Sequence, residues 1–228
     1  MPRRERPQIT TRSEHWMRVA ANEKSGTLND LIIRAFKWNE GETITWLSPI
    51  ESDHFAEYYD QDFLDRLGVT NLKVPLNRFW PRSGPRWDGL ARTHSGKLIL
   101  VEAKAYIEEA VDFCSKAGLK AMTQISVALQ KAKQAFGASP DAPWEAPYYQ
   151  YANRLAHLCF LHCENELDVY LVFLYFADAP DVPYPCSVSE WHGAERLLKK
   201  SLGLGPHPFR DRVATIIWSV PQMLSHKP

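Results

Sequence analysis

The chain has 228 residues, of which 45% are hydrophobic and 24% charged, and its 27 basic and 27 acidic side chains give a net charge of zero. This composition is ordinary for a soluble globular protein and argues against a surface coated in phosphate-binding charge, although a local patch would be enough. There is no recognisable signal peptide and no apolar run of 18 residues, so we expect neither export nor membrane insertion. Four cysteines in a chain of this size favour reduced thiols and a cytoplasmic location.

The first fifty residues are expected to form an N-terminal arm followed by a helical and strand extension. Residues 1–24 are polar and rich in arginine, which indicates a loose arm or a first helix. Apolar residues at helical spacing predict a helix over 27–38, capped by Thr27. Alternating apolar and polar residues over 42–47 predict a strand.

Residues 51–180 are expected to contain the core domain. An apolar stripe predicts a helix that starts at Ser52 or Asp53 and runs to about residue 67. Residues 71–80 indicate a first core strand, at an edge or broken, because Pro75 cannot donate a hydrogen bond to a neighbouring strand. A hairpin follows, with strands near 85–92 and 97–104.

The second half of the chain predicts an alternation of helices and strands. A convincing helix over 119–136 and a second over 148–163 are separated by a proline-rich loop. Residues 168–176 are the most strand-like segment and are expected to lie centrally in the sheet. In residues 181–228, a helix over 189–202 and a strand over 212–220 are expected to pack on the core. This order indicates an α/β layer architecture.

The hairpin brings charged residues together. His94-Ser95-Gly96 fits a three-residue loop, and if Thr93 pairs with Lys97, Asp88 lies opposite Glu102. Directly opposed residues have Cβ atoms roughly 4.5–5.5 Å apart. The two-residue period of a strand adds Lys104 to the face that carries Glu102. The sequence therefore predicts two carboxylates and a lysine at one point.

Such a trio suits metal-dependent phosphodiester hydrolysis. Two carboxylates at that distance repel unless a proton or a cation lies between them. Mg²⁺ takes oxygen ligands, can polarise a phosphate and lowers the pKa of a bound water. A neighbouring lysine can position that water or stabilise the charge that develops in the transition state.

Asp88, thirteen intervening residues, and then Glu102-Ala103-Lys104 at the end of an apolar strand resemble the PD-(D/E)xK nuclease superfamily. Trp87, not proline, precedes Asp88, and the nearest upstream proline is Pro85. The resemblance implies a restriction-endonuclease-like αβββαβ core with a mixed central sheet flanked by helices. It also implies that Asp88, Glu102 and the Ala103 carbonyl hold Mg²⁺, or Mn²⁺ in its place, while Lys104 orients the attacking water.

Two further catalytic residues are implied by the same resemblance. Many members add an acid from the helix before the first core strand, and Glu57 is the best candidate, with Asp53 one turn earlier as the alternative. Some subfamilies place a glutamine on the helix after the Glu-x-Lys strand, for which Gln124 is the candidate.

Four residues are predicted to contact nucleic acid. The substrate is expected to be DNA, with RNA as the alternative. Tyr106 follows Lys104 by two residues and can stack on a base. Lys116 and Lys120 belong to a stretch with four lysines and no acid, and Arg154 suits a phosphate contact. Cutting both strands of a duplex would favour a homodimer.

Two other readings stay open at this point. The chain can be a catalytically silent nucleic-acid-binding or interaction module on the same fold. It can also be a structural α/β protein with an accidental motif. The structural alternative predicts a one-residue slip at Gly96, which would put Asp88 and Glu102 on opposite faces of the hairpin.

Overall fold

The computed structural model describes residues 3–4, 10–39, 41–112 and 118–225. At its centre is a five-stranded mixed sheet in the order β2-β4-β5-β6-β7. Strand β4 pairs antiparallel with both β2 and β5, whereas β5, β6 and β7 run parallel. The strands are β2 (Ile44–Ser48), β4 (Gly89–Thr93), β5 (Leu98–Lys104), β6 (Val169–Ala177) and β7 (Val213–Ser219).

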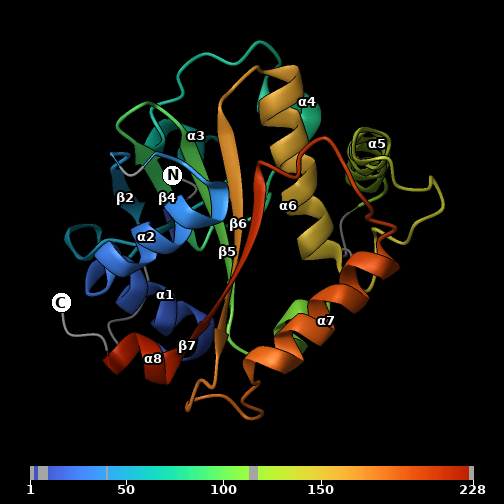
Figure 1. Cartoon of the computed structure of the whole chain (residues 1–228). Helices are drawn as coiled ribbons and strands as arrows, with labels where there is room; N and C mark the ends of the chain where they lie inside the picture. The colour runs from blue at the N-terminus through green and yellow to red at the C-terminus, as the bar shows by residue number, and fades with distance from the viewer. Residues whose placement is uncertain (1–2, 5–9, 40, 113–117, 226–228) are drawn as a thin grey trace.

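Helices cover both faces of this sheet, as Figure 1 shows. One face carries α1 (Arg12–Asn22), α2 (Ser25–Phe36) and α8 (Val220–Ser225). The other carries α5 (Leu119–Phe136), α6 (Tyr149–Cys159) and α7 (Val188–Ser201). The smaller elements are β1 (Arg3–Arg4), β3 (Glu57–Tyr58), α3 (Gln61–Arg66), α4 (Leu76–Phe79), two 3-10 turns (Glu51–Asp53 and Ile107–Ala110) and a π-helical turn (Phe160–Glu164).

The alternation of side chains along β5 divides the core in two. Leu98 and Leu100 pack into the layer beneath α5 and α6, whereas Ile99 and Val101 pack against α1 and α2. Burial on both faces is usual for parallel strands inside an α/β sheet. Glu102 has the same parity as Leu100, so its carboxylate projects into the α5–α6 layer.

The position of α6 over the sheet is fixed by aromatic packing. The Tyr151 ring stacks on Phe173 with 3.8 Å between centroids. Phe173 of β6 is the register partner of Glu102 in β5. The first two turns of α6 therefore lie directly above the strand positions that carry Glu102 and Lys104.

Most predicted elements are confirmed with ends shifted by up to four residues: the first hairpin strand starts at Gly89, and the helix predicted over 148–163 is α6 followed by the π-helical turn Phe160–Glu164. The helix over 119–136 and the strands of the hairpin, of 168–176 and of 212–220 are all present. Thr27 is not a cap, because α2 already begins at Ser25.

The helix predicted over 52–67 is wrong. The chain instead forms a 3-10 turn, the short strand β3 and the six-residue helix α3. His54, Phe55 and Asp60 have φ angles of 50°, 53° and 50°, which no α-helix accommodates. Pairing of the main chain at Tyr58 with Trp87, whose N–H donates to the Tyr58 carbonyl at 3.1 Å, replaces the helical hydrogen bonds here.

The first core strand predicted over 71–80 is also wrong. Pro75 precedes the single turn α4, and its ring favours the start of a helical turn over a ladder position. The place beside β4 is taken by β2, whose residues Ile44 to Ser48 pair with Leu90 to Thr93. The coarser expectation is confirmed: the protein is a mixed α/β structure with an open five-stranded sheet flanked by helices. None of the described helices is both long and apolar enough to cross a membrane.

Candidate functional site

The hairpin has the predicted register. The Thr93 N–H donates to the Lys97 carbonyl at 2.9 Å, and the ladder ends with Gly89 opposite Val101. Asp88 immediately precedes Gly89, one residue beyond the end of the ladder, and its Oδ2 accepts the Ala103 N–H at 2.7 Å. The one-residue slip does not occur, so Asp88 lies beside the segment that carries Glu102 and Lys104.

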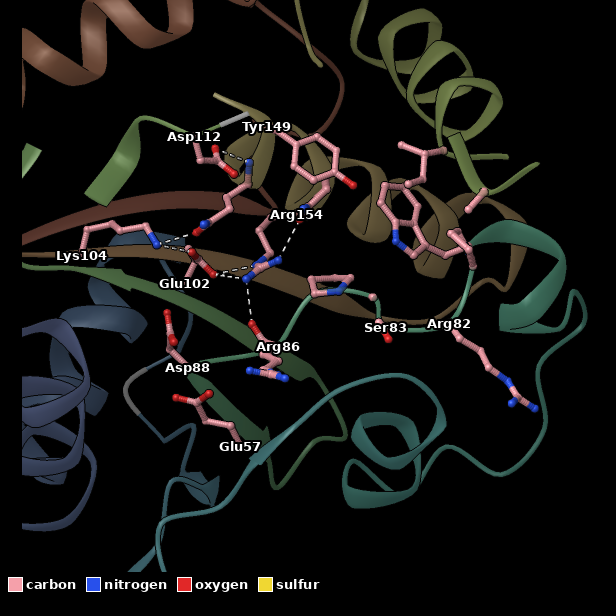
Figure 2. A pocket seen from close by; sticks show the side chains of 18 residues that line it. Glu57, Arg82, Ser83, Arg86, Asp88, Glu102, Lys104, Asp112, Tyr149 and Arg154 are labelled. Carbon is pink, nitrogen blue, oxygen red and sulfur yellow. Dashed lines mark hydrogen bonds and ion pairs between the residues drawn. The ribbon is translucent and has the colours of Figure 1, made fainter. Parts of the chain in front are cut away.

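Glu57 reaches the same point from β3. The antiparallel bridge between Tyr58 and Trp87 sets Glu57 against Asp88. Figure 2 shows these two carboxyl groups near each other, and the Glu57 side chain is buried. Glu57 was expected on a helix; it is instead delivered by a strand. Asp53, its alternative, accepts from the Tyr58 hydroxyl and pairs with Arg66 at 3.6 Å.

Two positively charged side chains form ion pairs with the Glu102 carboxylate. Its Oε2 accepts from the Arg154 guanidinium, at 2.6 Å from Nε and 2.5 Å from Nη2. Its Oε1 lies 2.6 Å from the Lys104 Nζ. Lys104 also donates to the Gln150 Oε1 at 2.7 Å. Figure 2 shows the contacts from Lys104 through Glu102 to Arg154.

The repeats of helix and strand explain why these four residues meet. Gln150 and Arg154 are one helical turn apart, a rise of about 6 Å along α6. Lys104 and Glu102 are two residues apart in β5, a rise of about 6.6 Å. Because α6 runs antiparallel to β5, Gln150 contacts Lys104 and Arg154 contacts Glu102.

Further hydrogen bonds hold the α6 side chains in place. The Gln150 backbone N–H donates to the Asp112 Oδ1 at 2.9 Å. Arg154 donates to the Arg86 carbonyl at 2.7 Å and to the Asn153 Oδ1 at 2.8 Å, and its guanidinium lies 4.9 Å from the centre of the Trp87 ring. The Arg154 guanidinium is therefore fixed beside Glu102, and a direct phosphate contact would require its ion pair to open.

Burial and charge push the two central carboxyl groups apart in pKa. Burial raises the pKa of Asp88 well above its usual value, and the nearby Glu102 and Glu57 carboxylates raise it further. Burial alone would also raise the pKa of Glu102, but Arg154 and Lys104 lower it below the ordinary value. The Lys104 pKa is raised because its two carboxylate neighbours outweigh the effect of burial.

These residues line a cavity of about 680 Å³. Glu57, Glu102, Asn153 and Arg154 are buried, whereas Arg82, Ser83 and Arg86 are exposed. The cavity walls come from the loop 80–86, from the start of α6 and from Ala121 and Ile125 of α5. An acidic and lysine-bearing floor thus lies below a rim that contains arginine.

Several predicted site residues lie elsewhere. The Gln124 amide donates to the Asn77 carbonyl at 2.9 Å and does not line the cavity. The Tyr106 hydroxyl accepts from Arg12 at 3.0 Å, under the Arg12 guanidinium. Lys120 is exposed in an adjoining depression with Arg82. Lys116 lies outside the described residues.

Gln150 and Asp112 were not found from the sequence. A pattern was available, because Gln150 and Arg154 are four residues apart on a predicted helix and so share a face. The resemblance instead favours Gln124 as the glutamine of the site, because α5 is the first helix after β5. In the structure, the buried Ile125 turns toward the core and the neighbouring Gln124 turns toward α4.

The donor chemistry of the floor fits a hard divalent cation. Carboxylates of Glu57, Asp88 and Glu102 and the Ala103 carbonyl are oxygen donors of the kind that Mg²⁺ binds. Within the described part of the chain, no three His, Cys, Asp or Glu side chains are already grouped to hold a metal ion. Both Glu102 oxygens already contact Arg154 or Lys104, so a metal at Glu102 would share the carboxylate with these two side chains.

Comparison of the chain with protein-family models, with curated proteins and with solved structures found no match. What the protein does is therefore inferred from the geometry of this site.

Proposed function

We propose that this protein is a Mg²⁺-dependent nuclease of the PD-(D/E)xK superfamily that hydrolyses phosphodiester bonds, with DNA as the preferred substrate. The observation that carries the proposal is the meeting of Asp88, Glu102 and Lys104 on the floor of one cavity. The order α2-β2-β4-β5-α5-β6 also supports it, because it follows the αβββαβ plan of a restriction-endonuclease-like core.

The carboxylates supply the metal ligands in this proposal. Asp88, Glu102 and the Ala103 carbonyl would hold Mg²⁺, and Glu57 beside Asp88 adds a third carboxylate. When bound, the ion polarises the scissile phosphate and lowers the pKa of a water. Metal binding favours the ionised form of Asp88 and so acts against the burial and the neighbouring carboxylates that raise the pKa of this group.

Lys104 orients the attacking water. Its ammonium group donates hydrogen bonds, and the Gln150 amide oxygen fixes the direction of one of them. The water oxygen forms a bond to phosphorus and gives up a proton, while the bond from phosphorus to the leaving oxygen breaks and the leaving oxygen takes up a proton. Stabilisation of the charge on phosphate by a fixed ammonium group favours the transition state over the ground state.

The alternative is a silent nucleic-acid-binding or interaction module on the same fold. The two ion pairs at Glu102 favour it, because a carboxylate with two internal cations is stable without a metal. This module predicts no divalent cation bound at Asp88 and no strand cleavage.

The test is a cleavage assay on plasmid, single-stranded circular DNA and RNA with Mg²⁺, with Mn²⁺ and with EDTA. We expect cleavage by the wild type that requires the metal and is lost in Asp88→Asn. Arg210→Ala, at an exposed position on the loop before β7, is the matched control and should cleave normally. Cleavage that survives Asp88→Asn would contradict the assignment of the site, and absence of any cleavage would favour the binding module.

A further inference from the structure

The reacting groups of the proposed nuclease lie below the protein surface. The exposed fraction of the Glu102 side chain is 3%, and that of Lys104 is 13%. Glu57 is 3% exposed as a residue. A phosphate must therefore enter the cavity to reach them, because no route over a flat surface leads to these atoms.

The size of the cavity limits what can enter. Its volume of about 680 Å³ is in the range of pockets that hold one small organic molecule, roughly 300–1,000 Å³. That volume suits one or two nucleotides of a single strand. In a DNA duplex each phosphate is tied to a paired helix whose major groove alone is about 12 Å wide, so the duplex would have to enter with it.

Two aromatic residues border the cavity but are largely covered. Trp80, from the loop after α4, is 4% exposed and packs on His157 with 4.7 Å between ring centroids, and Tyr149, from the start of α6, is 8% exposed. Proteins that bind single strands combine basic groups that follow the backbone with aromatic side chains that stack bases, and in this cavity the basic groups are the accessible ones. Figure 2 shows Tyr149 directed into the space above Arg154.

Basic side chains stand on the rim. Arg82 and Arg86 are exposed and border the cavity on the loop that follows α4. The loop is anchored, because Asp60 accepts the N–H groups of Ser83 and Gly84 at 3.0 and 2.8 Å. Lys120 borders the depression next to Arg82, so positive charge continues from the cavity mouth toward the start of α5.

We infer that the substrate is single-stranded DNA, which enters the cavity between the loop 80–86 and α6, with its phosphates on Arg82 and Arg86. This inference rests on the proposed function and adds the substrate class. We expect a blunt duplex to reach the buried Glu102 and Lys104 less well than a single strand, because each of its phosphates is tied to the paired helix.

The experiment compares three fluorescent substrates of about 30 nucleotides, longer than a single-strand footprint of roughly 4–16 nucleotides. They are one single strand, the blunt duplex of the same sequence, and that duplex with a single-stranded gap in its middle. With Mg²⁺ we expect the single strand to be cut at least tenfold faster than the duplex, and cuts in the gapped substrate to fall within the gap. Equal or faster cleavage of the blunt duplex would overturn the inference while leaving the nuclease intact.

Binding separates the inference from the proposed function. Affinity of Asp88→Asn for the single strand and for the duplex is measured by fluorescence anisotropy with Ca²⁺, over a range of salt concentrations. We expect at least tenfold tighter binding of the single strand, and weaker binding by Arg82→Ala and Arg86→Ala with a salt slope smaller by about 0.7 each. Arg210→Ala is the control.

The outcomes are distinct. Single-strand preference in binding without any cleavage would support the inference about the occupant and refute the nuclease. Equal affinity for the single strand and the duplex would overturn the inference even if cleavage occurs. The same holds if Arg82→Ala and Arg86→Ala bind DNA as tightly as Arg210→Ala.

Discussion

The Asp88 carboxylate accepts the Ala103 backbone N–H at 2.7 Å, which ties the residue before β4 to the strand that ends in Glu102 and Lys104. The β4–β5 ladder has already ended at Gly89, so this side-chain contact extends the pairing by one step. The contact holds Asp88, whose ionised form burial and two neighbouring carboxylates disfavour, beside the strand end that carries Glu102 and Lys104.

Asp88→Asn should stabilise the metal-free protein at neutral pH. The folded-state pKa of Asp88 is raised, so its ionisation costs stability as pH rises from about 3.8, the usual Asp value, toward neutrality. Asparagine keeps the Ala103 hydrogen bond and removes the charge. We expect a gain of about 1 kcal/mol, or roughly 2–4 °C in Tm for a chain of this size, measured by thermal unfolding in EDTA.

The gain should shrink as the pH is lowered toward 4, where wild-type Asp88 is protonated. Added Mg²⁺ should raise the Tm of the wild type more than that of Asp88→Asn. Asp211→Asn, a change at an exposed acid, serves as control and should be neutral. A loss of stability in Asp88→Asn at pH 7 would contradict the repulsion described here.

Glu102→Gln should have the opposite effect on stability. It leaves the Arg154 guanidinium buried and the Lys104 ammonium largely buried without their shared counter-charge. Removal of one partner from a buried ion pair costs about 3–5 kcal/mol. Urea unfolding should show a loss of about 3 kcal/mol, against almost none for Glu108→Gln at an exposed position. A neutral Glu102→Gln would mean that these ion pairs contribute nothing to folding.

The hairpin and the long elements could be predicted because their signals are local. Gly96 and the three-residue loop set the register, and the register alone brings Asp88 to Glu102. Leu119 to Phe136 carries an apolar stripe of five turns, too long to be overridden by its surroundings.

The segments around Glu57 could not be predicted, since distant partners decide them. Residues 54–60 have helical spacing of apolar side chains, yet main-chain pairing with Trp87 makes β3. The sequence places Gln150 on the helix face of Arg154, but its contact with Lys104 depends on the packing of α6 over β5, which Tyr151 stacking on Phe173 in β6 sets. Contacts between elements far apart in sequence leave no local signal.

Gln150→Ala should slow cleavage, if the chain is a nuclease, by about tenfold or more. The amide fixes the Lys104 ammonium, and small displacements of a catalytic group are costly. The loss should fall on kcat, with KM little changed, in steady-state cleavage of a labelled oligonucleotide. Gln124→Ala is the informative comparison, since that residue contacts Asn77 instead; a larger effect at Gln124 than at Gln150 would reverse this assignment.

Gly89→Ala should destabilise the fold. A Cβ at Gly89 would lie 2.8 Å from the Met17 Cε, which would have to shift, and 3.1 Å from the Val101 Cβ on the paired strand, tighter than most packed contacts. Overpacking of this kind costs about 1–3 kcal/mol, which thermal unfolding would detect. Gly26→Ala, in α2 with nothing within 4 Å of the new Cβ, should instead stabilise by about 0.5–1 kcal/mol. Equal Tm values for the two variants would contradict the close packing of β4 against α1.

The most direct test of the central claim is the single-turnover rate of DNA cleavage in Mg²⁺ by the wild type and by Lys104→Met, with Mn²⁺ affinity measured on the same samples. Methionine keeps much of the side-chain volume and removes the ammonium group that orients the water. We predict that Lys104→Met binds Mn²⁺ and loses cleavage by at least a hundredfold. Cleavage by Lys104→Met at the wild-type rate would contradict the proposed chemistry at this site.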